Sequence, residues 1–107
     1  MKIVATALIL LSVVAQAAEV RLAWDPNSEP DLAGYKVYVG DASRAYTRTD
    51  NVGNVTMYTV VGLAHGKNYF FAATAYDTSS NESGFSNEVS GAAWHVTPER
   101  VAEMELR

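Results

Sequence analysis

The feature that most constrains the fold is a short polar turn between two apolar runs, Leu63-Ala64-His65-Gly66-Lys67-Asn68-Tyr69. A leucine ends the run 57–63, and Tyr69 opens an alternating run that continues to Tyr76. In an antiparallel β-sandwich such a turn forms a tyrosine corner, in which the ring packs on the core and the hydroxyl bonds to backbone a few residues upstream. We therefore interpret the residues before it as strands that lead to this corner.

Other β-prone stretches are separated by clusters of Gly, Pro, Asp, Asn and Ser, which are turn signals. The stretches predicted as strands are 20–24, 35–39, 57–63, 69–76 and 85–90, with a short edge strand within 44–52. Because successive side chains of a strand point to opposite faces, one face of each strand supplies the core. The core residues predicted in this way are Trp24, Tyr35, Val37, Leu63, Tyr69 and Phe71. Gly62 shifts the alternation between Val60 and Leu63, as a β-bulge would. The sequence thus predicts an all-β antiparallel sandwich.

The N-terminus has the pattern of an export signal. Lys2 supplies a positive end, residues 3–14 are almost wholly apolar, and Ala15-Gln16-Ala17 fits a cleavage site. The apolar run is shorter than the roughly 20 residues that span a bilayer. We expect residues 1–17 to be a signal peptide that is removed, which leaves no stable membrane anchor and places the chain in the periplasm, at the cell surface or outside the cell.

Composition excludes several classes of function. The chain has 107 residues, no cysteine and a formal net charge of −4. Without cysteine there are no disulfides, thiolate nucleophiles or zinc–thiolate sites, and the acidic balance disfavours nucleic acid as a partner. The spacing of the two histidines, His65 and His95, does not indicate a metal-binding pair or a nucleophile–base pair. We therefore expect a protein that is not an enzyme and carries no cofactor or metal.

Several motifs together resemble a fibronectin type III domain, of the kind found in exported bacterial proteins. They are Trp24 at the end of a strand, Gly34–Tyr38, the turn Leu63–Tyr69, Ala75-Tyr76-Asp77, Glu82-Ser83 and Ser86–Val89. The resemblance covers about residues 20–92. It implies an immunoglobulin-like sandwich of seven strands, three in one sheet and four in the other. It also implies a spacer or binding module without enzymatic activity.

The expected domain is residues 18–92, and its first strand is short or missing. Only Ala18 and Glu19 precede Val20 once residues 1–17 are removed. The strand 20–24 would then lie at an open sheet edge with unpaired backbone groups. The tail, residues 93–107, has three alternatives: a frayed end, a short docked helix starting near Thr97-Pro98, or an added strand on the open edge.

The candidate binding residues are aromatic and polar. If Tyr35 and Val37 face the core, then Tyr38, Phe70 and Tyr76 lie on the opposite, outer face of neighbouring strands. Exposed aromatic side chains often mark a partner site, although strands favour these residues in any case. The loop that follows adds Asp77, Asn81 and Glu82.

Acidic residues in two loops, 25–31 and 77–82, could ligate calcium, but turn formation by their side chains is the default interpretation. The expected function is therefore an exported binding or structural module that contacts a protein or polysaccharide. The alternative is an assembly subunit that pairs through its open sheet edge with another copy or another envelope protein.

Overall fold

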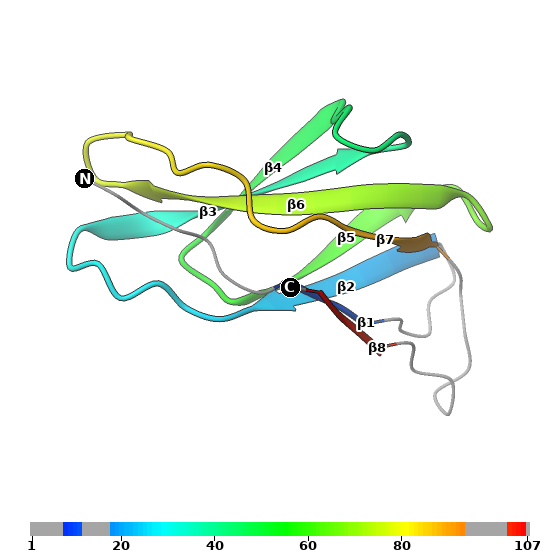
Figure 1. Cartoon of the computed structure of the whole chain (residues 1–107), viewed down its shortest axis with the longest axis horizontal. Coiled ribbons are helices and arrows are strands. Elements are labelled where there is room, and N and C mark those ends of the chain that lie inside the picture. Colours follow the sequence, from blue (N-terminus) through cyan, green and yellow to red (C-terminus); the bar gives the residue numbers. More distant parts are fainter. Residues whose placement is uncertain (1–7, 12–17, 94–102, 107) are drawn as a thin grey trace.

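The computed structural model describes residues 8–11, 18–93 and 103–106, with side chains described for 18–93. The described residues form strands joined by turns and loops (Figure 1). The strands are β1 Leu8–Leu11, β2 Ala18–Trp24, β3 Leu32–Gly40, β4 Arg48–Gly53, β5 Met57–Leu63, β6 Asn68–Asp77, β7 Val89–Ala92 and β8 Glu103–Leu106. Within these ranges there is no helix that could cross a membrane.

Two antiparallel sheets pack face to face (Figure 1). Sheet I has the order β4-β3-β6-β7 and sheet II the order β5-β2-β1-β8. The predicted all-β, immunoglobulin-like sandwich is confirmed. The division into sheets differs from the expected three and four strands because β8 adds a fourth strand to sheet II beside β1.

The core lies between the sheets and is built by alternation. In β2 the burial alternates at every residue, so that Val20, Leu22 and Trp24 face inward. They pack against buried side chains of β3 and β6, namely Tyr35, Val37, Phe71, Ala73 and Ala75. Trp24 and Tyr35 pack edge to face, with ring centroids 5.5 Å apart. Aromatic pairs prefer this geometry, because the positive ring edge then meets the negative face.

The turn 63–69 forms the predicted tyrosine corner. The backbone N–H of Ala64 donates to the Tyr69 hydroxyl at 2.9 Å, and the half-buried ring packs against the core. Gly66 has φ +80°, a conformation that glycine adopts without the steric cost of a Cβ atom. Its N–H also donates to the Ala93 carbonyl at 2.7 Å, so the corner is bonded to the end of the domain.

A bulge in β5 explains how Val60 and Leu63 both reach the core. The pairing with β2 shifts between Ala18↔Leu63 and Val20↔Val60, which leaves one extra residue on β5. Gly62 adopts φ +75° there, and Val60 and Leu63 are both buried. A side chain at position 62 would be strained at this φ.

Sheet I and sheet II are joined at one side by polar contacts between their edge strands. Arg48 of β4 donates to Asp50 and to the Val61 carbonyl of β5, the latter at 2.8 Å. The Tyr58 hydroxyl donates to Asp50 at 2.6 Å. Because the Val61 carbonyl is occupied, this part of the β5 edge is less available for pairing with another strand.

A short strand does precede β2 in the full chain, and it lies inside the segment expected to be a signal peptide. β1, residues 8–11, pairs with β2 from Leu8↔Trp24 to Leu11↔Arg21. In the full chain β1 therefore covers the β2 edge. The open edge predicted from the sequence applies only to a chain that has lost residues 1–17.

The tail contains a strand where a short helix was one of the expectations. Glu103–Leu106 forms β8, which pairs with β1 rather than with β2. An isolated helix of about three turns is marginal in water, whereas a neighbouring strand satisfies backbone groups directly. The expected helix start near Thr97-Pro98 lies outside the described residues.

The return strand after the polar loop is displaced relative to its prediction. It was expected at 85–90, but β7 begins only at Val89. Before it, two serines bond to β6 through both backbone and side chain: their N–H groups donate to the Ala75 and Ala73 carbonyls at 2.8 Å, and the N–H groups of Ala75 and Ala73 donate to the hydroxyls of Ser83 and Ser86 at 2.9 Å. Residues 83–86 therefore follow β6 without forming a regular strand.

Candidate binding surface

The outer face of sheet I carries the predicted aromatic residues, but spreads them along the strands. Tyr38 lies opposite Ala72, whereas Phe70 lies opposite Gly40 and Tyr76 opposite Gly34. At about 3.3 Å per residue, Phe70 and Tyr76 are about 20 Å apart along β6. The three predicted aromatic residues therefore do not form one continuous patch.

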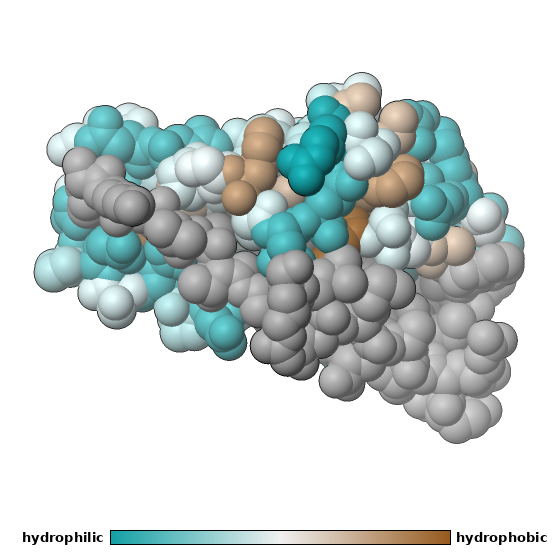
Figure 2. All heavy atoms as spheres, in the orientation of Figure 1, coloured by the Kyte–Doolittle hydropathy of each residue, from teal (hydrophilic) through white to brown (hydrophobic). Residues whose placement is uncertain are grey.

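Tyr38 instead packs with two aromatic side chains that the sequence did not place with it. Its ring centroid is 4.9 Å from that of Phe85 and 6.1 Å from that of Tyr46, and the centroids of Tyr46 and Phe85 are 5.2 Å apart. Phe85 is 53% exposed. We call these three residues the aromatic cluster. Figure 2 shows that the apolar residues on the side in view form separate patches among hydrophilic ones.

The aromatic cluster was missed because two of its members lie outside regular strands. Tyr46 belongs to the turn between β3 and β4, and Phe85 to the irregular segment before β7. The available signal was an aromatic residue within an otherwise polar stretch, at position 46. Phe85 is the first residue of the return strand predicted at 85–90, and that prediction does not determine which way its side chain points.

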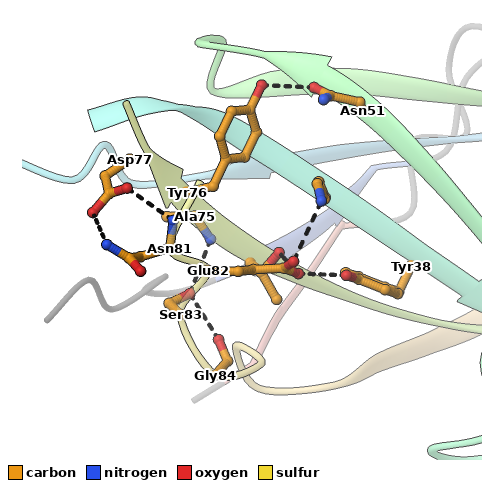
Figure 3. A network of polar contacts seen from close by, with 11 residues as sticks. Tyr38, Asn51, Ala75, Tyr76, Asp77, Asn81, Glu82, Ser83 and Gly84 are labelled. Carbon is orange, nitrogen blue, oxygen red and sulfur yellow. Dashed lines mark hydrogen bonds and ion pairs between the residues drawn. The ribbon is translucent and has the colours of Figure 1, made fainter. Parts of the chain in front are cut away.

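Glu82 holds one side of the aromatic cluster (Figure 3). Its carboxylate accepts hydrogen bonds from the hydroxyls of Tyr38 and Thr74, the latter at 2.7 Å, and from Lys36 Nζ at 3.3 Å. Partial burial disfavours the charged form, but these three donors outweigh it and lower the pKa of Glu82. Burial and the bond to Glu82 raise the pKa of Tyr38. Glu82 is therefore an ionised, fixed acceptor.

Glu88 holds the other side in the same way. It accepts hydrogen bonds from the Tyr46 hydroxyl, the Ser43 hydroxyl at 2.6 Å and the Arg44 backbone N–H at 2.8 Å. Arg44 adopts a left-handed φ of +59° in this turn. Burial opposes ionisation, yet the hydrogen bonds lower the pKa of Glu88. Glu88 was not among the predicted site residues.

Tyr76 occupies a separate place on the same face (Figure 3). Its hydroxyl donates to Asn51 Oδ1 at 2.8 Å, and Lys36 Nζ lies 5.6 Å from its ring centroid. The ring covers Gly34, where a Cβ atom would lie 2.7 Å from the Tyr76 hydroxyl. Lys36, Thr74 and Glu82 separate Tyr76 from Tyr38, so the two tyrosines offer distinct surfaces. Phe70 is half-buried and pairs in register with Ser90 on its other side.

Asp77 and Asn81 stabilise their own loop. Asp77 is 2% exposed, and it accepts the N–H groups of Ser79 and Asn81 and the Asn81 side-chain amide at 2.8–3.0 Å. The Asn81 amide and the two N–H groups lower the pKa of Asp77. Such bonds are those of a hairpin loop closed by its own side chains. Among the described residues, no group of three or more acidic or histidine side chains is arranged to hold a metal ion.

Two antiparallel sheets, a tyrosine corner and a core of Trp24 against Tyr35 define an immunoglobulin-like β-sandwich. Residues 10–92 match the family model for the fibronectin type III domain, and the chain belongs to this family. Such domains are typically binding or structural modules and are generally non-catalytic.

Solved structures agree with this assignment. An Fn3-like protein from Clostridium thermocellum is 27% identical, with TM-score 0.62, and the match covers 80% of this chain and 86% of that one. A human fibronectin type III domain from the KIAA0970 protein is 23% identical, with TM-score 0.64, covering 91% and 76%. Part of a β-1,2-glucanase from Parabacteroides distasonis is 24% identical, with TM-score 0.68, covering 88% of this chain and 13% of that one. The search among curated proteins gave no match.

Proposed function

We propose that this chain is an exported, non-enzymatic binding module that contacts a protein or polysaccharide through the outer face of sheet I. The observation that carries the proposal is the aromatic cluster. Phe85 is 53% exposed, and its ring packs on those of Tyr38 and Tyr46, whose hydroxyls bond Glu82 and Glu88. Preorganised aromatic side chains bind at low entropic cost, because little freedom remains to be lost.

Export is supported by the N-terminal pattern of Lys2, the apolar residues 3–14 and Ala15-Gln16-Ala17. The 27% identity to an Fn3-like protein from Clostridium thermocellum supports a bacterial source for the chain. Mass spectrometry of the protein recovered outside the cytoplasm tests export directly. A mass that begins at Ala18 supports export with cleavage, and an intact N-terminus on the recovered protein contradicts it.

The binding surface is tested by affinity capture from envelope extracts of the organism that makes the chain. The variant is Phe85→Ala, and the matched control is Val61→Ala, which removes an equally exposed apolar side chain from sheet II; Val61 is 50% exposed. We expect the partner to be lost with Phe85→Ala and retained with Val61→Ala. Equal capture by both variants would contradict the proposal.

A second candidate function is assembly through the edge of β2. The observation that favours it is the location of β1: its residues, 8–11, cover Arg21–Trp24 and lie within the predicted signal peptide. Removal of residues 1–17 would leave the β2 backbone available to a strand from another copy or another envelope protein. Light scattering on the chain 18–107 tests pairing between copies: a dimer supports self-assembly, and a monomer at high concentration contradicts self-assembly.

A further inference from the structure

The aromatic cluster is packed, so a ligand must bind on it rather than within it. The three ring centroids are 4.9, 5.2 and 6.1 Å apart, which is the range of direct ring contact. No side chain fits between rings at these distances. The most accessible part is the surface of Phe85, which is 53% exposed and packs on both tyrosine rings.

Each tyrosine links Phe85 to a carboxylate. Tyr38 contacts Phe85 with its ring and Glu82 with its hydroxyl, and Tyr46 contacts Phe85 and Glu88 in the same way. Phe85 therefore contacts two tyrosines, each of which bonds a different ionised carboxylate. A side chain with an apolar stem and a charged end matches this arrangement.

The polar groups around Phe85 are mainly hydrogen-bond acceptors. The hydroxyls of Tyr38 and Thr74 donate to Glu82, and those of Tyr46 and Ser43 donate to Glu88. A hydroxyl has one hydrogen to donate, so none of the four has a donor left; Thr74 is also buried at 2% exposed, so only the other three can present lone pairs to a ligand. A carboxylate has about four acceptor sites, and each of the two accepts three bonds from the groups named above. Glu82 and Glu88 therefore each keep an acceptor site.

From this acceptor surplus we propose that the partner presents an arginine side chain to this surface, so that the arginine stem covers Phe85 and its guanidinium donates to Glu82 or Glu88. This inference rests on the proposed binding function. Arginine has five donors and no acceptor, and its planar group is weakly hydrated and stacks on aromatic rings. A sugar hydroxyl, by contrast, also seeks donors; the four hydroxyls supply none, and the Lys36 ammonium beside them already bonds Glu82.

The net charge of the chain also favours a basic partner, but it is not the main source of discrimination. The chain carries a net charge of −4, which attracts a basic segment. Lys36 at Glu82 and Arg44 near Glu88 each offset one charge locally. Discrimination should therefore depend on donor geometry and on the Phe85 contact as well as on charge, and lysine should bind less well than arginine.

The test is a titration of the full chain, observed by NMR, with a blocked five-residue peptide Gly-Ser-Arg-Gly-Ser. Matched peptides carry citrulline or lysine in place of arginine, and a neutral glucose oligomer is the polysaccharide probe. We expect the arginine peptide to shift the Phe85, Tyr38 and Tyr46 ring signals. Its affinity should fall about tenfold with citrulline, with Phe85→Ala and with Glu82→Gln/Glu88→Gln. Val61→Ala should leave the affinity unchanged.

Two results would overturn the inference. One is equal binding of the citrulline peptide, and the other is arginine binding that is insensitive to Phe85→Ala. If the glucose oligomer binds instead and Phe85→Ala abolishes its binding, the arginine inference fails while the proposed binding function stands. If no probe shifts the cluster signals, and the captured partner is retained by Phe85→Ala, both fail.

Discussion

The backbone N–H of Ala64 donates to the hydroxyl of Tyr69, five residues further along the chain, at 2.9 Å. This bond closes the corner that leads from sheet II into β6 of sheet I. Tyr69 packs on the core, whereas the aromatic cluster is formed by side chains of the outer face of sheet I. The bond therefore holds the fold without taking part in the surface that we propose binds a partner.

Replacing Tyr69 by Phe should lower the free energy of unfolding by about 1 kcal/mol, the usual net value of one hydrogen bond. The ring still packs on the core, so the fold should persist. Urea unfolding measures the loss, and partner capture by the folded protein should be unchanged. If the Tyr69→Phe protein is fully folded and still captures less partner, the corner contributes to the binding site.

Gly34→Ala should destabilise the domain by about 1–3 kcal/mol, as overpacking does. The new Cβ atom would lie 2.7 Å from the Tyr76 hydroxyl and 2.9 Å from the Gly53 carbonyl carbon. Gly84→Ala is the matched control, since nothing lies within 4 Å of a Cβ atom there. Equal unfolding midpoints in urea for the two variants would contradict the packing described at Tyr76.

Ser86→Ala should cost about 1–3 kcal/mol, because the Ala73 N–H loses its acceptor in a buried part of β6. It should also weaken partner binding, since Ser86 is the neighbour of Phe85 in the chain and its bond to Ala73 anchors this segment on β6. Ser79→Ala, in the exposed part of the same connection, is the control. Thermal unfolding and capture measured on both variants test this, and unchanged binding with reduced stability would show that Phe85 is placed by other contacts.

Stability should fall as the pH drops through the range where Glu82 and Glu88 bind protons. The pKa of each is lower in the folded chain than its ordinary value of 4.5. The unfolded chain therefore binds these protons more tightly, and the stabilisation is present above pH 4.5 and is lost as the pH falls through the folded-state values. Glu82→Gln/Glu88→Gln should flatten the pH dependence of unfolding below pH 4.5. An unaltered slope would contradict the assigned hydrogen bonds.

The sequence predicted the fold well because its signals are local and repeated. Alternation along 20–24 and 69–76, the turn before Tyr69 and Gly62 between two inward residues each determine a backbone path. The surface was harder to predict. Tyr46 and Phe85 meet only because a turn and an irregular segment lie side by side. Such a contact produces no periodic pattern of residues in the sequence. Glu88 likewise reaches Ser43 and Tyr46 across more than 40 residues of sequence.

β1 shows a different limit of the sequence. An apolar run such as Leu8–Leu11 fits both an export signal and a buried strand, because both require apolar side chains. In the full chain it serves as a strand on β2. It keeps this role only if residues 1–17 are retained, whereas the export that we propose removes them.

The most direct test of the central claim is site-specific photo-crosslinking in the organism that makes the chain. A photoreactive phenylalanine analogue replaces Phe85 in the aromatic cluster or, as the control, Val61 on sheet II. We predict a crosslinked adduct of higher mass from position 85 and none from position 61. An adduct from position 61 alone would contradict the assignment of the binding surface to the outer face of sheet I.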